Sequence, residues 1–230
     1  MQDEKGAAAQ PADGATATGW DDFELRKPAI VCRWRLASST LPLANRHLRA
    51  LSVRDAGGGR VSTHLIAWAK QHIEWTLAEG TADEPNGVLL LVVDEKGRAA
   101  MSCGPYEPLP ELTAGALARR ARGSSSEAEK TGVAPEALWL VRDGALVAGI
   151  DEGWHASGAS GLVSDLASTL GLPVSREDGL ADRVASGAVA YDEAFLVSDE
   201  HGVVGASDAS GEVTAKLAGA YRTLLERAGK

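Results

Sequence analysis

Gly158, Ala159 and Ser160 stand directly before a segment with the pattern of a helix, and residues in this position could bind an anion. The first backbone N–H groups of a helix have no partner within it, and the positive end of the helix dipole lies there. A phosphate suits such a place because its oxygens accept several hydrogen bonds. Ser160 could equally cap its own helix, which requires no ligand. The residues alone leave both interpretations open.

Other residue types that carry out chemistry occur without the spacing that their chemistry requires. The five histidines form no HExxH motif and no pair with metal-ligand spacing, so we expect no metal site. Cys32 and Cys103 lie far apart and outside any CxxC motif, which favours two reduced thiols. The chain also contains no Walker A, GxSxG or GxGxxG motif.

The composition is that of a globular protein, with 44% hydrophobic and 24% charged residues. A formal net charge of -9 argues against a nucleic-acid partner, because it repels phosphate backbones. The longest apolar run, GVLLLVV at 87–93, is too short to span a bilayer, and the N-terminus lacks a basic-then-apolar signal. We therefore expect a cytoplasmic protein that binds neither nucleic acid nor membranes.

The first half of the chain has the pattern of an N-terminal α/β domain over 20–107. Residues 1–19 are small and polar without periodicity, so we expect a disordered tail there. Apolar residues recur every three or four positions over 61–79, which predicts a helix with one buried face. The uninterrupted apolar run at 87–93 predicts a central, buried strand. In chain order we expect a strand over 29–36, helices over 41–52 and 61–79, and a hairpin over 87–103.

A linker is predicted over 108–132, where PYEPLPEL (105–112) passes into a polar, Ser-rich run. A C-terminal α/β domain follows over 133–230. Turn residues between apolar runs predict hairpins, and helical spacing marks the last segment. In chain order we expect strands over 136–142 and 145–150, a helix over 161–170, a strand over 173–175, a helix over 179–187, strands over 193–198 and 203–208, and a helix over 213–228.

The order of these elements carries a family resemblance over the last hundred residues. LWLVRDGALVAGIDEG (138–153) leads through GASGLVSDLASTLGLPV (158–174) to DEAFLVSDEHGVVGASDASG (192–211). This stretch resembles the C-terminal domain of class IV aminotransferases and aminodeoxychorismate lyases, fold-type IV enzymes that use pyridoxal phosphate (PLP). The resemblance implies an α/β fold of two small domains, like that of D-amino-acid aminotransferase, and a homodimer.

The resemblance also implies residues that would hold the cofactor. Arg49 lies in HLRAL (47–51), beside the position of the family's phosphate-binding arginine, which in strict alignment is Ala50. Lys130 is the only lysine between Lys96 and Lys216, so it would be the lysine that links to PLP. The remaining contacts to the phosphate would come from Gly158, Ala159, Ser160 and Ser198.

Three positions depart from the family pattern. Ala50 replaces the arginine, Thr131 replaces the glutamate that pairs with the pyridine nitrogen, and Asp199 brings a negative charge close to the phosphate position. We therefore favour a noncatalytic relative, either a binder of a small amino-acid-like or anionic ligand or an interaction module. The alternative is an active PLP-dependent aminotransferase or lyase acting on an amino-acid-like substrate.

Overall fold

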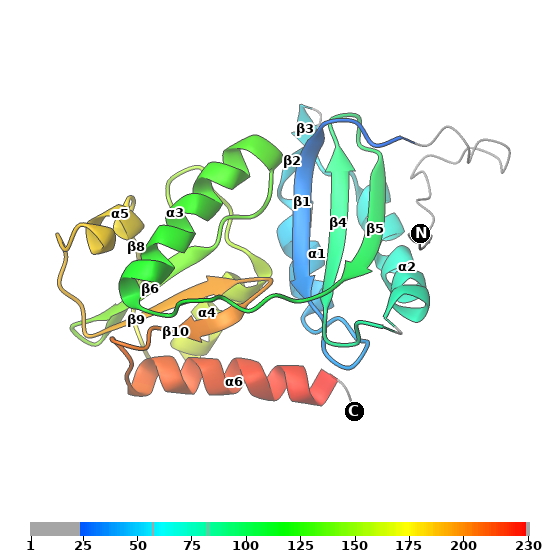
Figure 1. Ribbon diagram of the computed structural model, residues 1–230. Coiled ribbons are helices and arrows are strands. Elements are labelled where there is room, and N and C mark those ends of the chain that lie inside the picture. The colour runs from blue at the N-terminus through cyan, green and yellow to red at the C-terminus, as the bar shows by residue number, and fades with distance from the viewer. Residues whose placement is uncertain (1–23, 57, 82, 229–230) are drawn as a thin grey trace, which may run out of the picture.

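The computed structural model describes residues 24–56, 58–81 and 83–228, which form two halves, each built around its own sheet (Figure 1). The strand order is β1-β4-β5 in the N-terminal half and β10-β9-β6-β7-β8 in the C-terminal half. One stretch of chain after β5 crosses from the first half to the second. The α/β class predicted from the sequence is confirmed, and the predicted tail over 1–19 lies outside the described residues.

In the N-terminal half, a three-stranded antiparallel sheet is covered on one face by two helices. The elements are β1 (Pro28–Arg35), α1 (Ala44–Ser52), β2 (Asp55–Ala56), β3 (Gly59–Arg60), α2 (Thr63–Gly80), β4 (Val88–Asp94) and β5 (Ala99–Gly104). β4 pairs with both β1 and β5, which confirms the prediction of a central strand. Trp34 and Leu89 from the sheet pack with Leu51 of α1 and Trp68 of α2.

In the C-terminal half, helices cover both faces of a five-stranded sheet. The elements are α3 (Ala114–Thr131), β6 (Ala137–Arg142), β7 (Ala145–Ala148), α4 (Gly158–Thr169), β8 (Val174–Arg176), α5 (Leu180–Ala185), β9 (Glu193–Ser198), β10 (Gly202–Gly205) and α6 (Glu212–Ala228). Side chains alternate along the strands, so that Leu140 and Leu196 face α3 and α5. Trp139 and Phe195 face α4 and α6. Burial on both faces explains why β6 and β9 are apolar almost throughout.

The prediction of a linker over 108–132 is wrong from residue 114 onward, where the chain forms α3. Thr113 caps this helix, because its side chain accepts a hydrogen bond from the Ala116 N–H at 3.2 Å. Leu117 and Ala121 are buried in the core of the C-terminal half. The composition was misleading because α3 buries mainly alanines and one serine, Ser124, which give a weak apolar pattern. α3 therefore belongs to the C-terminal half.

The two halves meet where β1 approaches the end of α3 and the turn between β9 and β10. The Val31 N–H donates to the carbonyl of Gly132 (3.2 Å), and the Arg35 N–H donates to the carbonyl of Asp199 (3.0 Å). Gly132 ends α3 with φ +69°, and a Cβ at this position would overlap the Ala29 carbonyl. Only glycine fits there. This junction places residues from both halves around one cavity.

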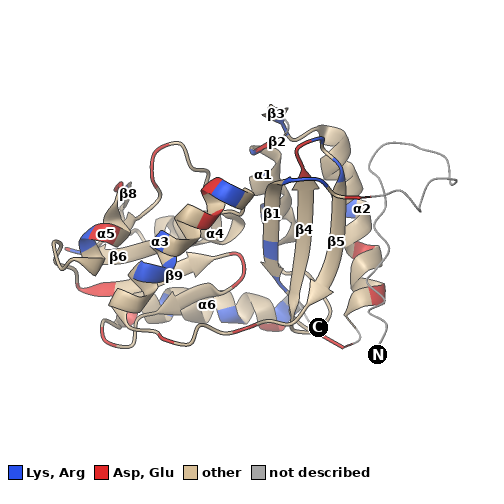
Figure 2. Ribbon diagram, turned by 45° about the horizontal axis from the view of Figure 1, so that its top comes forward, with Lys and Arg blue, Asp and Glu red and all other residues tan. Residues whose placement is uncertain are grey.

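The charged residues of the two halves are mixed in sign. Basic and acidic positions are interspersed along the helices and loops of both halves (Figure 2). This mixture of signs differs from the continuous basic stripe that tracks a nucleic-acid backbone. Among the same residues, no helix combines the length and the apolar character needed to cross a membrane.

Candidate functional site

A cavity of about 240 Å³ lies between the two halves, beside Ser157, the residue that precedes α4. Its walls come from β1 and α1, from residues 132–136 after α3, from the loop over 153–157, and from the turn between β9 and β10. Ligand sites are commonly concave places of this kind between structural units. The side chains in its walls include Arg33, Trp34, His47, Trp154, Asp199 and Glu200.

Ser157, the residue before α4, lines the cavity, and the first N–H groups of the helix find acceptors within the chain. Ser157 is the cap residue, because its Oγ accepts a hydrogen bond from the Ser160 N–H at 3.1 Å. The carboxylate of Asp199 accepts from the Ala159 N–H at 2.7 Å and from the Gly158 N–H at 3.4 Å. A carboxylate of the chain thus occupies the place where an anion would bind. Ser160, which the sequence offered as a cap, is not the cap residue.

Asp199 is held as a buried anion by this helix end and by His47. Burial raises the pKa of the Asp199 carboxyl, but His47 and the two N–H groups together bring the pKa below its usual value. The His47 ring is 2% exposed, and its Nδ1 lies 3.4 Å from Asp199 Oδ2. The ring also stacks on Trp34, with 5.2 Å between centroids. The site therefore contains a negative charge of its own.

The structure brings four of the six predicted cofactor residues together and leaves two outside. Ser198 is buried in the cavity wall, where its Oγ accepts a hydrogen bond from the His201 N–H at 2.8 Å. Arg49 and Lys130 have exposed side chains, and neither lines the cavity. Ala50, the strict match to the family's arginine, does line it. The four residues that gather around Asp199 are Gly158, Ala159, Ser160 and Ser198.

The cavity does not fit PLP. That cofactor requires a lysine amine for its covalent link and a site for its phosphate. Among the described residues, no lysine lines the cavity, and Lys130 lies in the last turn of α3 with its side chain in solvent. Asp199 holds the N–H groups that the phosphate would need, and its charge would repel a phosphate. Both requirements are therefore unmet.

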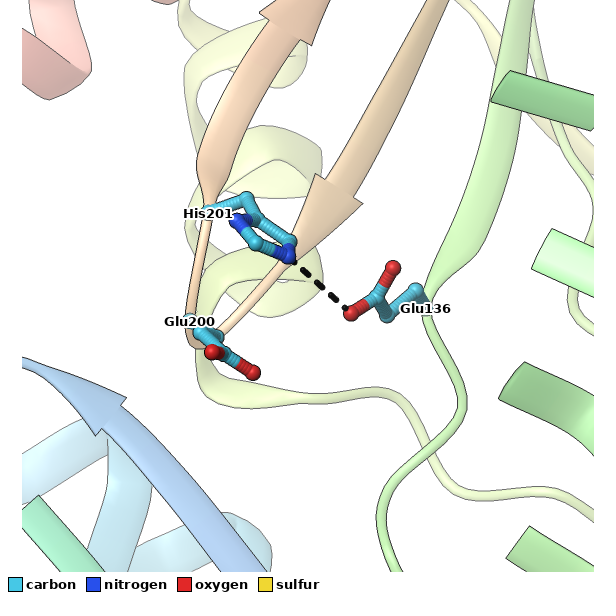
Figure 3. A group of neighbouring side chains, drawn as sticks. All are labelled: Glu136, Glu200 and His201. Atoms are coloured by element: carbon cyan, nitrogen blue, oxygen red, sulfur yellow. Dashed lines mark ion pairs between the residues drawn. The ribbon is translucent and has the colours of Figure 1, made fainter. Parts of the chain in front are cut away.

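Glu136, Glu200 and His201 form a second group of polar side chains next to the cavity (Figure 3). One ligand atom from each lies within 4.8 Å of the others, a spacing able to hold a metal ion. Glu136 is already engaged, because Arg120 donates to both of its oxygens at 2.8 and 2.9 Å. His201 Nδ1 lies 3.2 Å from the Tyr106 hydroxyl, and His201 Nε2 lies 3.6 Å from Glu136 Oε1.

The charges around this group favour an ion-pair network over a metal site. Burial lowers the pKa of His201; Glu136 opposes that shift, while Arg120, Arg35 and Arg33 add to it. Three guanidinium groups lie close by, and they disfavour a divalent metal ion because they would repel its double charge. Burial also raises the pKa of Glu200. We therefore interpret Glu136 as the anionic centre of an ion-pair network with Arg120.

Several residues of the cavity wall were not identified from the sequence. Asp199 was noted as a departure from the family pattern, but its role as acceptor for α4 was not predicted. Trp34, Trp154 and Glu200 were missed. A usable signal was WHAS (154–157), because residues just before a helix cap lie close to the start of that helix.

Comparisons with known proteins identify the fold. No protein-family model matches the chain, and no curated protein matches its sequence. The 4-amino-4-deoxychorismate lyase from Pseudomonas aeruginosa is similar in structure, with TM-score 0.55 and 19% identity over 92% of this chain and 97% of that chain. A putative branched-chain amino acid aminotransferase from Thermotoga maritima is similar with TM-score 0.54 and 16% identity, and the match covers 86% of each chain. An aminotransferase from Brucella abortus, bound to the cofactor PLP, is similar with TM-score 0.51 and 14% identity. This match covers 90% of this chain and 94% of that chain.

Proposed function

We propose that the protein is a noncatalytic relative of class IV aminotransferases and aminodeoxychorismate lyases that binds a small amino-acid-like ligand. The chain has the fold of these enzymes, as the sequence resemblance predicted, but its cavity does not fit PLP. The observation that carries the proposal is a cavity wall without a lysine among the described residues. Asp199 at the start of α4 supports it. The cavity of about 240 Å³ remains, with room for a ligand of amino-acid size.

The side chains of the cavity favour a ligand that carries both charges. Glu200 lies in the wall and accepts no hydrogen bond within the described residues, so it suits an ammonium group. Arg33 uses one guanidinium nitrogen for its 2.7 Å bond to Glu127 and keeps further N–H donors for a carboxylate. Trp34 and Trp154 add apolar surface for a side chain. An α-amino acid combines these three features.

The first experiment tests the noncatalytic part of the proposal. The protein is incubated with PLP, reduced with borohydride and mapped by mass spectrometry. Lys70, which is also exposed, serves as the reference for adventitious labelling. We expect equal, low labelling of Lys130 and Lys70 and no bound cofactor after dialysis. Labelling of Lys130 to about one equivalent, with Lys70 unlabelled, would identify an active PLP enzyme instead.

The second experiment tests the ligand class. A panel of amino acids and their deaminated and decarboxylated analogues is screened by thermal shift and calorimetry. We expect at least one amino acid to bind, and Glu200→Gln to weaken its binding at least about tenfold. Arg119→Gln, a change on the exposed face of α3, is the matched control and should leave binding unchanged. An absence of binding by every amino acid, or equal binding by both variants, contradicts the proposal.

The proposed assembly is a homodimer, which rests on the resemblance to the family alone. Sedimentation velocity over a range of protein concentrations measures it directly. A monomer at every concentration would remove this part of the proposal and leave the ligand site untouched.

A further inference from the structure

Trp154 separates the cavity between the two halves from a much smaller cavity behind it. The small cavity has a volume of about 20 Å³, which is enough for about one water molecule. Trp154 lines both cavities, and so do Pro135 and Ser157. The two spaces therefore share a wall, and the bulkiest side chain in this wall is the indole of Trp154.

The row of cavities continues beyond the small one. A third cavity of about 230 Å³ is lined mainly by residues of α3 and α5. It shares Ser125, Gly149 and Asp151 with the small cavity, so the small cavity adjoins a larger space on each side. Replacing the indole of Trp154 by a small side chain would therefore extend the cavity between the halves toward α5.

Contacts on two sides hold Trp154 in place, so it forms a wall and not a movable lid. Its loop is anchored at Asp151, whose carboxylate accepts a hydrogen bond from the Gly179 N–H at 2.8 Å. The Trp154 N–H donates to the Asp151 carbonyl at 3.1 Å. The indole packs against two apolar clusters, one that contains Val133 and one that contains Ile150. A ligand therefore has to fit in front of this ring.

We infer that Trp154 limits the length of the ligand's side chain, so that the native cavity takes α-amino acids with short side chains and excludes those with long ones. The inference rests on the proposed function, in which Glu200 and Arg33 hold the two charged groups of the ligand. The side chain is then left with the apolar part of the wall. Trp34 is only 1% exposed, so Trp154 offers the more accessible indole there.

A series of amino acids with side chains of increasing length tests the inference. Calorimetry gives the affinities of alanine, norvaline and norleucine for the wild type and for Trp154→Ala, Trp154→Phe and Trp75→Ala. Where space is open, each added methylene strengthens binding about fourfold. We expect Trp154→Ala to raise the preference for norleucine over alanine at least about tenfold, and Trp154→Phe to raise it less.

Trp75→Ala is the matched control. It removes an indole that is 49% exposed on α2 and lies outside the walls of the three cavities. This change should leave the preference as it is in the wild type. If amino acids bind and the preference is the same in all four proteins, the inference is overturned and the proposed function stands. If no amino acid binds to any of them, both fail. Should Trp154→Ala not fold, Trp154→Phe gives the same comparison with a smaller change.

Indole itself probes the opened space without an amino acid. We expect added indole to raise the Tm of Trp154→Ala, because it refills the space of the removed ring and binds only the folded protein. The wild type and Trp75→Ala should show no such rise. A Tm of Trp154→Ala that is unchanged by indole would mean that no space opens behind the ring, which overturns the inference independently of amino-acid binding.

Discussion

Replacing Arg120 with alanine is expected to destabilise the protein far more than the same change at its neighbour Arg119. Both arginines lie on α3, and each pairs with one glutamate. Arg120 donates two hydrogen bonds to Glu136, whose side chain is 6% exposed. Arg119 meets Glu111 at 3.2 Å, with side chains 61% and 58% exposed. The two changes share helix and residue type and differ mainly in the burial of the partner.

The magnitude follows from what the carboxylate of Glu136 loses. Its backbone N–H is held by Ser124 Oγ at 2.8 Å, so the side chain cannot simply move into water. Leaving a buried charge without its partner costs about 3–5 kcal/mol. Arg120 is itself 39% exposed, so solvent screening reduces our expectation to about 2–3 kcal/mol. For the exposed Arg119 pair we expect about 0–0.5 kcal/mol.

Urea denaturation followed by tryptophan fluorescence measures both changes, and calorimetry gives the melting temperatures. At this chain length, we expect Arg120→Ala to lower Tm by about 4–12 °C and Arg119→Ala by less than about 2 °C. Adding Glu136→Gln to Arg120→Ala should recover about 1 kcal/mol, because it removes the unpaired charge. Equal losses for the two arginine variants, or no recovery in the double variant, would refute this account of Glu136.

Three further predictions use other buried groups. Burial raises the pKa of the Asp94 carboxyl, but hydrogen bonds from neighbouring N–H groups bring this pKa below its usual value. The ionised form of Asp94 therefore stabilises the fold above pH ~4, the unfolded-state value. This contribution is lost as the pH falls through the lowered pKa. Asp94→Asn should therefore cost about 2 kcal/mol at neutral pH, with a difference in urea midpoints that vanishes in acid. Gly158→Ala places a Cβ 2.7 Å from His47 Nδ1 and should cost about 1–3 kcal/mol, whereas Gly161→Ala, with no atom within 4 Å, should gain about 0.5–1 kcal/mol in the same unfolding assay. Burial raises the pKa of the Cys32 thiol to about 12. Iodoacetamide at mildly alkaline pH should therefore modify Cys32 at least about a hundredfold more slowly in the native protein than in the urea-unfolded protein. Equal rates in the two states would contradict the burial of Cys32.

Strands and most helices were predictable because their side chains carry a local period. In β4 and β6, burial on two faces leaves an apolar run that is visible without any knowledge of the partners. The alternation that sends Trp139 and Leu140 to opposite faces gives no sequence signal there, because both faces are apolar. The strand order within each sheet likewise depends on distant residues. Local pattern therefore predicted the elements and left their arrangement to the resemblance.

The candidate site was less predictable because its contacts join residues far apart in the chain. Asp199 lies 40 positions from Ala159, and no local pattern shows that its carboxylate turns toward that N–H group. Arg49 and Ala50 are adjacent in the sequence, yet only Ala50 reaches the cavity, since neighbouring helical positions face different directions. The charged group around Glu136 combines α3, the residue before β6 and the turn after β9. Such a group exists only after the C-terminal half has folded.

The Asp199 carboxylate at the start of α4 also changes how folding depends on the surroundings. A protein whose helix end is neutralised by a diffusing ligand gains stability that rises with the concentration of that ligand. Here the neutralising group is covalently attached, so its local concentration is the same in every medium. The stability of the α4 end should then be indifferent to cofactor supply, dialysis and dilution. The acceptor at this end of α4 is therefore a part of the folded chain itself.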